Sequence, residues 1–180
     1  MKVISGKYKG RNIEGFDIDG TRPTMDRVKE SLFAMIQNYL DNATVLDLFS
    51  GSGNLAIESL SEGAKSAVLV DSNYKAIKVI EGNIKTIGIT DTKVLNMDYK
   101  KAIEYLKNET FNIIFLDPPY KTNYIEEAMN LISKYNILSN DGIVVCESDS
   151  LDKIVYDDNY KCIKYKKYGD KYIVILKKVC

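Results

Sequence analysis

The chain has 180 residues, of which 45% are hydrophobic and 28% charged, and its formal net charge at pH 7 is zero. This size and composition indicate one folded domain with a substantial core, without the overall basic field that marks many nucleic-acid-binding proteins. Histidine is absent and the three cysteines have no metal-ligand spacing, which excludes Ser-His and Cys-His nucleophilic catalysis and predicts no metal site.

Residues 1–24 are expected to form a small N-terminal β hairpin or arm, because four glycines divide them into short segments. The main domain is then expected over residues 25–180. The first residues quickly turn polar, and no apolar run approaches the ~18 residues that a membrane span needs. A cytoplasmic protein is therefore expected.

Beyond the arm, strand and helix patterns alternate. A first helix is expected over about Met25–Leu40, with Thr24 as a candidate N-cap, because apolar residues recur there at helical spacing. Strands are expected at Thr44–Phe49, Ser66–Asp71, Thr92–Met97, Phe111–Asp117 and Gly142–Glu147, and helices between them at Asn54–Glu62, Asn73–Ile87, Lys100–Lys107 and Tyr124–Tyr135. Several strands are apolar throughout, which is typical of a parallel sheet covered by helices on both faces. The last two segments, Tyr160–Lys167 and Lys171–Lys178, are predicted to form an antiparallel hairpin.

Acidic residues stand at or just after the first four predicted strand ends: Asp47, Asp71, Asp98 and Asp117. Asp47 is followed by the loop Ser50-Gly51-Ser52-Gly53, whose glycines let a ligand approach the backbone in front of a helix N-terminus. Asp71 is placed to accept hydrogen bonds from ribose hydroxyls, and Asp98 from an adenine amine. A row of carboxylates suits a cationic nucleoside such as S-adenosylmethionine better than NAD, which carries two phosphates. Any single acid of the row is equally well explained as a helix N-cap.

The segment Asp117-Pro118-Pro119-Tyr120 is the most informative feature of the sequence. It follows the apolar strand that begins at Phe111, at a place where open α/β sheets carry their chemistry. Two prolines fix φ and remove two N–H donors, so the carbonyl groups of Asp117 and Pro118 are held in a stiff, outward-facing arrangement. A carboxylate, rigid carbonyl groups and an aromatic ring suit a planar group that bears an NH2. The alternative interpretation is a Pro-Pro turn with a packed tyrosine.

Both ends of the chain are locally basic. Residues 161–178 carry seven lysines against one acid, Asp170, and tyrosines are interspersed among them. This composition is compatible with a surface that contacts phosphates. Solvated lysines that protect an edge strand explain it equally well.

Five segments carry a family resemblance: Ile4–Arg11, Arg22–Phe33, Leu46–Gly53, Phe115–Tyr120 and Tyr168–Asp170. Together they resemble the bacterial methyltransferases that modify a guanine N2 in 16S ribosomal RNA, over essentially all 180 residues. The glycine loop and Asp-Pro-Pro-Tyr are shared by many amino-methyltransferases, whereas Arg-Pro-Thr-x-Asp-Arg-Val selects this family. The resemblance implies the α/β, Rossmann-like class I SAM-dependent methyltransferase fold. This fold has a seven-stranded, mostly parallel sheet with an antiparallel C-terminal hairpin, and a small N-terminal β hairpin precedes it here.

The resemblance also implies three groups of functional residues. The cofactor S-adenosylmethionine would be held by Asp47, Phe49, Ser50, Gly51, Gly53, Asp71 and Asp98. The guanine would be held by Asp117, the Pro118 carbonyl and Tyr120. The RNA would be contacted by Lys7, Lys9, Arg11, Arg22 and Arg27, although Arg22 and Arg27 could instead clamp acids at the sheet edge. The expected partner is 16S rRNA in a small-subunit assembly particle, and a monomer is expected.

Three other functions stay open on the sequence. An amino-methyltransferase acting on DNA adenine or protein glutamine would use the same Asp-Pro-Pro-Tyr chemistry, and only the N-terminal segment argues against it. An NAD-dependent oxidoreductase could use Gly51–Ala56 as its fingerprint, with a tyrosine or lysine in place of the absent histidine. The third is a non-enzymatic RNA-binding module. The presence of both the acid row and Asp-Pro-Pro-Tyr argues against it, because a protein that only binds RNA has no need of both.

Overall fold

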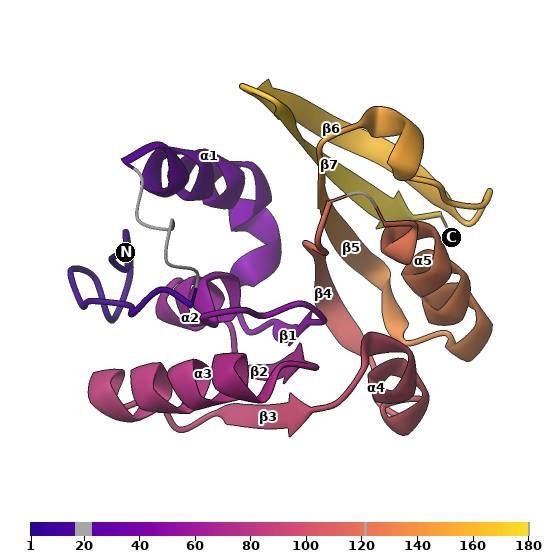
Figure 1. The fold of residues 1–180 in the computed structure, drawn as a ribbon. Coiled ribbons are helices and arrows are strands. Elements are labelled where there is room, and N and C mark those ends of the chain that lie inside the picture. Colours follow the sequence, from indigo (N-terminus) through magenta and orange to yellow (C-terminus); the bar gives the residue numbers. More distant parts are fainter. Residues whose placement is uncertain (17–22, 121, 180) are drawn as a thin grey trace.

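A computed structural model describes residues 1–16, 23–120 and 122–179, with only the backbone for 23–25, and contains a seven-stranded sheet with helices on both faces (Figure 1). The helices are α1 (Pro23–Leu40), α2 (Asn54–Ser61), α3 (Tyr74–Ile87), α4 (Tyr99–Tyr105), α5 (Tyr124–Tyr135) and a 3-10 turn, η1 (Leu151–Lys153). The strands are β1 (Thr44–Asp47), β2 (Ser66–Asp71), β3 (Thr92–Asn96), β4 (Phe111–Leu116), β5 (Leu138–Ser148), β6 (Tyr160–Tyr168) and β7 (Lys171–Lys178).

The strand order is β3-β2-β1-β4-β5-β7-β6. Strands β1 to β5 are mutually parallel, whereas β7 lies between β5 and β6 and is antiparallel to both. This confirms the predicted mostly parallel sheet with an antiparallel C-terminal hairpin. The order reverses between β1 and β4, so a ligand crevice is expected at the carboxyl ends of these two strands.

Most predicted boundaries hold to within two residues, and the differences have local causes. β1 ends at Asp47 rather than Phe49, because the Asp47 carboxylate accepts a hydrogen bond from the Phe49 N–H (3.3 Å) as the chain turns. α1 begins at Pro23, a residue type suited to a first helical turn. The side chain of the candidate N-cap Thr24 lies outside the described residues. β5 begins four residues before the predicted Gly142, because its first residue already pairs with β4 ahead of a register shift.

Two apolar layers lie on opposite faces of the sheet. Helices α1, α2 and α3 cover one face, with Ile36, Ile57 and Ile80 fully buried. Helices α4 and α5 cover the other face through residues such as Ile103 and Ile132. Burial of each such side chain stabilises the fold by about 1.5–3 kcal/mol, so the strand ends are held on a rigid platform. Within the described part of the chain, no helix is long and apolar enough to cross a membrane.

The N-terminal arm (residues 1–16) packs on α2 and α3. The described residues of the arm pair back on themselves in a short antiparallel hairpin around the bridge between Lys2 and Asn12, where the Val3 N–H donates to the Arg11 carbonyl (2.9 Å) and the Ile13 N–H to the Met1 carbonyl (2.8 Å). Side chains of the helices take up other backbone groups of the arm. Glu58 of α2 accepts two of its N–H groups at 2.8 and 3.2 Å, and Asn83 of α3 bonds both the N–H and the carbonyl of Glu14 at 2.9 and 3.0 Å. The arm is therefore ordered both by its own backbone pairing and by contacts with the main domain.

A buried ion pair ties this arm to α1 and α2. Lys29 of α1 is 3% exposed, and its Nζ lies 2.9 Å from Glu58 Oε1. The same Nζ donates to the Lys2 carbonyl (2.7 Å) and to Asn54 Oδ1 (2.8 Å) at the first residue of α2. Burial and the neighbouring charge of Glu58 raise the pKa of Glu62 to about 7. The cluster links the arm to the start of α2, directly behind the glycine loop.

Candidate active site

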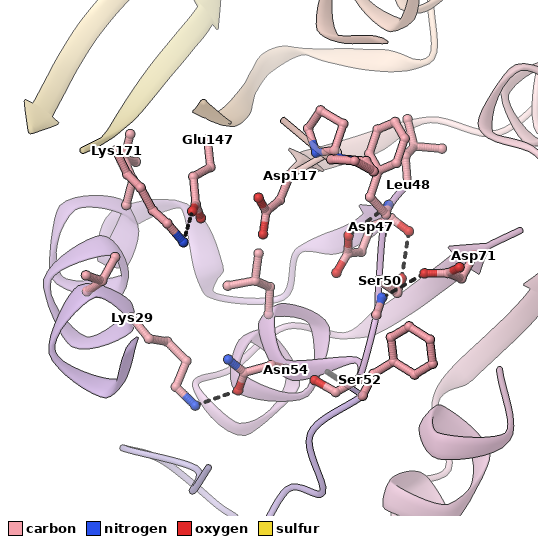
Figure 2. A pocket seen from close by; sticks show the side chains of 18 of the residues that line it. Lys29, Asp47, Leu48, Ser50, Ser52, Asn54, Asp71, Asp117, Glu147 and Lys171 are labelled. Atoms are coloured by element: carbon pink, nitrogen blue, oxygen red, sulfur yellow. Dashed lines mark hydrogen bonds and ion pairs between the residues drawn. The ribbon is translucent and has the colours of Figure 1, made fainter. Parts of the chain in front are cut away.

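A cleft of about 840 Å³ lies along the carboxyl ends of the parallel strands (Figure 2). The segments at the ends of β1 to β5 all contribute to it, and the turn between β6 and β7 closes one side. Its charged and polar side chains are Lys29, Asp47, Ser50, Ser52, Asn54, Asp71, Ser72, Asp98, Asp117, Glu147, Asp170 and Lys171. The arm contributes Met1, Gly15 and Phe16. The cleft thus lies where the strand order predicts a ligand site.

The loop after β1 presents its backbone to this cleft. Ser50 Oγ donates to the Asp47 carbonyl (2.9 Å) and accepts from the Val70 N–H (3.0 Å), which ties the end of β1 to the end of β2. Gly51 has φ +57°, and a Cβ there would meet nothing within 4 Å, so a ligand can approach this backbone. Gly53 precedes α2 with φ +84°, and a Cβ there would come within 3.1 Å of a β2 side chain. Ser50 and Gly51 line the cleft, whereas Gly53 packs behind them.

Asp71 and Asp98 line the cleft at the ends of β2 and β3. Asp71 accepts hydrogen bonds from the N–H groups of Gly51 and Asn73, each at 2.9 Å, and so anchors the glycine loop. Asp98 is the N-cap of α4 and accepts from the Lys100 N–H at 2.9 Å. The capping interpretation therefore applies to Asp98, and both carboxylates still border the cleft.

Asp47 and Asp117 carry carboxyl groups that their surroundings disfavour in the charged form. Asp47 is 1% exposed, and burial raises its pKa from 3.8 to about 7; the Phe49 N–H opposes this shift and the charge of Asp71 adds to it. Burial likewise raises the pKa of Asp117 well above its usual range, reinforced by the charges of Glu147 and Asp47 and opposed by Lys171. These two carboxyl groups with raised pKa values favour a cationic ligand, which would stabilise their charged forms.

The Asp-Pro-Pro-Tyr segment lies at the end of β4. Pro118 is buried and lines the cleft, whereas Tyr120, with 40% of its surface exposed, is not among the lining residues and lies beside Glu147, which is. The Tyr120 hydroxyl donates to Glu147 Oε1 at 3.2 Å, and Lys171 Nζ lies 5.4 Å from the centroid of its ring. The tyrosine is thus oriented by charged neighbours instead of being packed into the core, and its ring stays accessible for stacking.

Glu147 and Lys171 are cleft residues that were not predicted to have a role at the site. Their side chains form an ion pair at 3.2 Å, near the end of β5 and at the start of β7. Glu147 directly follows the apolar run Ile143–Cys146, just as Asp71 follows the apolar residues of β2. The rule used for the other acids could have found it. Lys171 is one of many lysines in the C-terminal segment, and its spacing does not distinguish it.

An aromatic wall borders the cleft near Asp98. Phe49, which was predicted, is joined by Tyr99 and Tyr124, which were not, and all three line the cleft. The Phe49 and Tyr124 rings are stacked with centroids 6.1 Å apart, and the Phe49 and Tyr99 centroids are 5.0 Å apart. Tyr99 is fixed by a hydrogen bond to Glu127. The wall offers a flat apolar surface beside a carboxylate.

Of the predicted RNA-contacting residues, the four that the structure describes do not border the cleft. Lys7, Lys9 and Arg11 are exposed on the arm, where the Lys7 N–H donates to the Ser61 carbonyl at 2.8 Å. Ser61 ends α2, roughly 10 Å along the helix from the cleft. Arg27 is exposed on α1, and Arg22 lies outside the described residues. Any contact of the three arm residues with RNA would therefore involve nucleotides at a distance from the reacting base.

The strand order, the glycine loop and the acids at the strand ends define a protein with the Rossmann-like methyltransferase fold. Several solved methyltransferase structures share this arrangement. The chain belongs to the family described as Conserved hypothetical protein 95, whose model matches residues 1–177.

Relatives of the chain carry methyltransferase names. "Putative rRNA methyltransferase YlbH" of Bacillus subtilis is 45% identical, over 83% of this chain and 83% of that protein. "Ribosomal RNA small subunit methyltransferase D" of Escherichia coli K12 is 32% identical, over 83% of this chain and 75% of that protein. The solved structure of "Putative methyltransferase yhhF" from Escherichia coli is 28% identical and superposes with a TM-score of 0.89, covering 99% of this chain and 97% of that one.

Proposed function

We propose that this protein transfers a methyl group from S-adenosylmethionine to the exocyclic N2 amine of a guanine in 16S ribosomal RNA. The observation that carries the proposal is the joining, in one cleft, of a carboxylate row with the Asp117-Pro118 end of β4. The first suits a cationic nucleoside and the second suits an aromatic amine. The names of the relatives supply the class of RNA.

The cleft suits S-adenosylmethionine in charge and in shape. When bound, this cofactor supplies a methyl group on a sulfonium cation. Asp47 and the Ser50–Gly53 loop would hold its methionine end, Asp71 its ribose and Asp98 its adenine amine, next to Phe49 of the aromatic wall. The open space beside Gly51 admits a close backbone contact. A cation would also stabilise the charged form of Asp47, whose raised pKa disfavours that form in its absence.

The task of the protein in such a reaction is mainly alignment. The lone pair of the guanine N2 is delocalised into the ring, so the amine is a weak nucleophile and must be held in line with the methyl group. Asp117 and the Pro118 carbonyl would accept hydrogen bonds from the NH2 group and stabilise the positive charge that develops on nitrogen. Because the pKa of Asp117 is raised, its carboxylate is also suited to accept the proton that the amine loses after transfer. Tyr120 would stack on a base that has left its helix.

The protein is expected to act as a monomer on an assembly particle of the small subunit. A single small domain has few elements with which to recognise a long RNA, so ribosomal proteins would present the target. An NAD-dependent oxidoreductase is the weaker alternative, because the two phosphates of NAD would enter a cleft in which Asp47, Asp71, Asp98 and Asp117 border the ligand space.

The test is a methylation assay with labelled S-adenosylmethionine and three substrates: protein-free 16S RNA, small subunits that lack the modification, and unmethylated DNA. After nuclease digestion, nucleoside mass spectrometry should find N2-methylguanosine from RNA or subunits. Label in DNA alone would overturn the proposal in favour of a DNA amino-methyltransferase. Label in none of the three substrates would refute an RNA substrate.

Two variants assign the roles within the cleft. Asp117→Ala should lose most turnover while cofactor binding, measured by calorimetry, persists. Asp71→Ala should weaken cofactor binding. Near wild-type turnover in the first variant, or unchanged affinity in the second, would remove that residue from the site.

A further inference from the structure

Glu147 and Lys171 form a charged pair beside Asp117, on the side away from Asp71 (Figure 2). Their side chains are 18% and 42% exposed, so the pair is neither a core ion pair nor a freely solvated one. Both residues line the cleft. A clamp between β5 and β7 is one explanation, but these strands already pair from Ile143↔Lys177 to Ser148↔Tyr172 without it. The pair is therefore available for contact with a ligand.

The order of Lys171, Glu147 and Asp117 along the cleft matches the hydrogen-bonding groups on the pairing edge of guanine. Figure 2 shows Lys171, Glu147 and Asp117 following one another, which gives a donor, an acceptor and an acceptor. The pairing edge of guanine carries the complementary series, with the O6 acceptor, the N1–H donor and the N2 amine donor side by side. When the N2 amine lies at Asp117, the N1–H faces Glu147 and O6 faces Lys171.

We propose that Glu147 and Lys171 select guanine, with the Glu147 carboxylate accepting the N1–H and the Lys171 ammonium donating to O6. The inference rests on the proposed function and adds the residues that choose the base. Adenine or cytosine with its amine at Asp117 would turn an unprotonated ring nitrogen, an acceptor, towards the Glu147 carboxylate. Such a mismatch leaves a charged acceptor without a donor, which is a strong basis for rejection.

The contacts of Glu147 hold it ready for this role. The Tyr120 hydroxyl donates a hydrogen bond to Oε1, and Lys171 Nζ forms an ion pair with the same oxygen, each at 3.2 Å. Within the described residues, Oε2 has no comparable contact. The same pair also holds the Tyr120 ring, through the hydroxyl and through the cation above the ring. The two residues proposed to select the base therefore also hold in place the Tyr120 ring that is proposed to stack on it.

The test compares guanine with 2-aminopurine at the target position. 2-Aminopurine keeps the C2 amine but has an acceptor at N1 and only hydrogen at C6. Small subunits are reconstituted with either base at the guanine mapped by the methylation assay, and methyl transfer to each is measured as kcat/KM. The wild-type protein should prefer guanine. Glu147→Gln should lower transfer to guanine by about tenfold and leave or raise transfer to 2-aminopurine, because the new amide can donate to N1.

A second variant keeps the test decisive if Glu147→Gln fails to fold. Lys171→Met should lower transfer to guanine by about tenfold more than transfer to 2-aminopurine, because only guanine has an O6, whereas weaker support of the Tyr120 ring affects both bases. Lys177→Met is the matched control, since Lys177 also lies in β7 but its Nζ sits 5.7 Å from the Tyr39 ring centroid, outside the cleft lining. Equal losses on both bases, or no loss, would overturn the inference and leave the pair a clamp. No transfer to either base by the wild-type protein would instead refute the proposed function.

Discussion

Asp47 lines the cleft, and the burial of its carboxyl group costs the fold free energy. Its carboxyl group is almost fully buried at the end of β1, and burial raises its pKa from 3.8 to about 7. The folded state therefore holds a proton that the unfolded state has released, between about pH 4 and pH 7. Because the unfolded state binds fewer protons in this window, the free energy of unfolding contributed by Asp47 falls as the pH rises through it.

Replacing Asp47 by asparagine should stabilise the ligand-free protein at pH 8. The amide keeps the oxygen that accepts the Phe49 N–H and has no charge to bury, so the gain should reach up to about 4 kcal/mol at pH 8 and vanish towards pH 4. Urea denaturation at both pH values measures this. Asp141→Asn, at an exposed position, is the control and should show no comparable difference. Equal stability of Asp47→Asn and wild type at pH 8 would contradict the buried-charge account.

At the scale of elements, the N-terminal arm depends on one close backbone approach. Gly6 has φ +83°, and a Cβ there would lie 1.9 Å from the Ser61 carbonyl oxygen at the end of α2. Ser61 Oγ also donates to the Ser5 carbonyl (2.6 Å) and accepts from the Tyr8 N–H (2.9 Å). The arm therefore lies against the helix end only if residue 6 has no side chain.

Gly6→Ala should displace the arm, and Gly10→Ala provides a matched control. Gly10 has nearly the same φ, +84°, but its Cβ would meet nothing within 4 Å. Both variants carry the cost of a left-handed alanine, about 1–2 kcal/mol, and only Gly6→Ala adds the clash. We expect faster hydrogen exchange at the Lys7 and Tyr8 amides and a lower melting temperature for Gly6→Ala than for Gly10→Ala. Equal behaviour of the two variants would show that the contact with Ser61 does not hold the arm.

The elements that sequence predicted well are those whose burial follows a local period. β2, β7 and α5 were placed to the residue, because apolar runs and helical spacing report directly which side chains meet the core. The arm was predicted less well. Its hairpin is short, with one bridge between Lys2 and Asn12, and no local pattern indicated that Glu58 and Asn83, which lie far along the chain, would bind its other backbone groups.

In the site, too, prediction depended on a local sequence signal. The acids that follow short strands were found from their position, and the structure brings Asp47, Asp71, Asp98 and Asp117 to one cleft. Lys29 was missed because a lysine on a helix is ordinarily solvated, and its burial depends on Glu58 from another helix. Partners of this kind are fixed by the tertiary structure alone.

Acidic and basic side chains gather on different parts of the whole molecule, although its formal net charge is zero. The cleft carries a row of carboxylates, whereas the arm and β6 expose lysines such as Lys9, Lys164 and Lys167. RNA phosphates would be drawn to the arm and β6 and kept from the cleft, which leaves the cleft for a cation and a neutral base. Basic side chains on the arm and β6 would bind RNA phosphates in a salt-dependent way, without giving the protein high affinity for every nucleic acid.

Reversing the charge of the arm should weaken RNA binding. The triple change of Lys7, Lys9 and Arg11 to glutamate should lower affinity for small subunits and reduce the slope of log affinity against log salt by about 2, at roughly 0.7 for each lost phosphate contact. Filter binding over a salt series measures this. The control reverses Lys85, Lys101 and Lys107, which are exposed on α3, on α4 and just after α4. Equal effects of the two triples would mean that the arm makes no specific phosphate contacts.

The position of β7 between β5 and β6 has a consequence for biosynthesis. As the chain leaves the ribosome, β5 and β6 emerge before the strand that joins them, so β5 keeps an open edge until β7 arrives. Lys171 arrives with that strand, whereas the glycine loop and the first four acids are already in place. A nascent chain that lacks β7 could thus form the cofactor half of the cleft while lacking the means to choose a base, and it would expose a strand edge prone to aggregation.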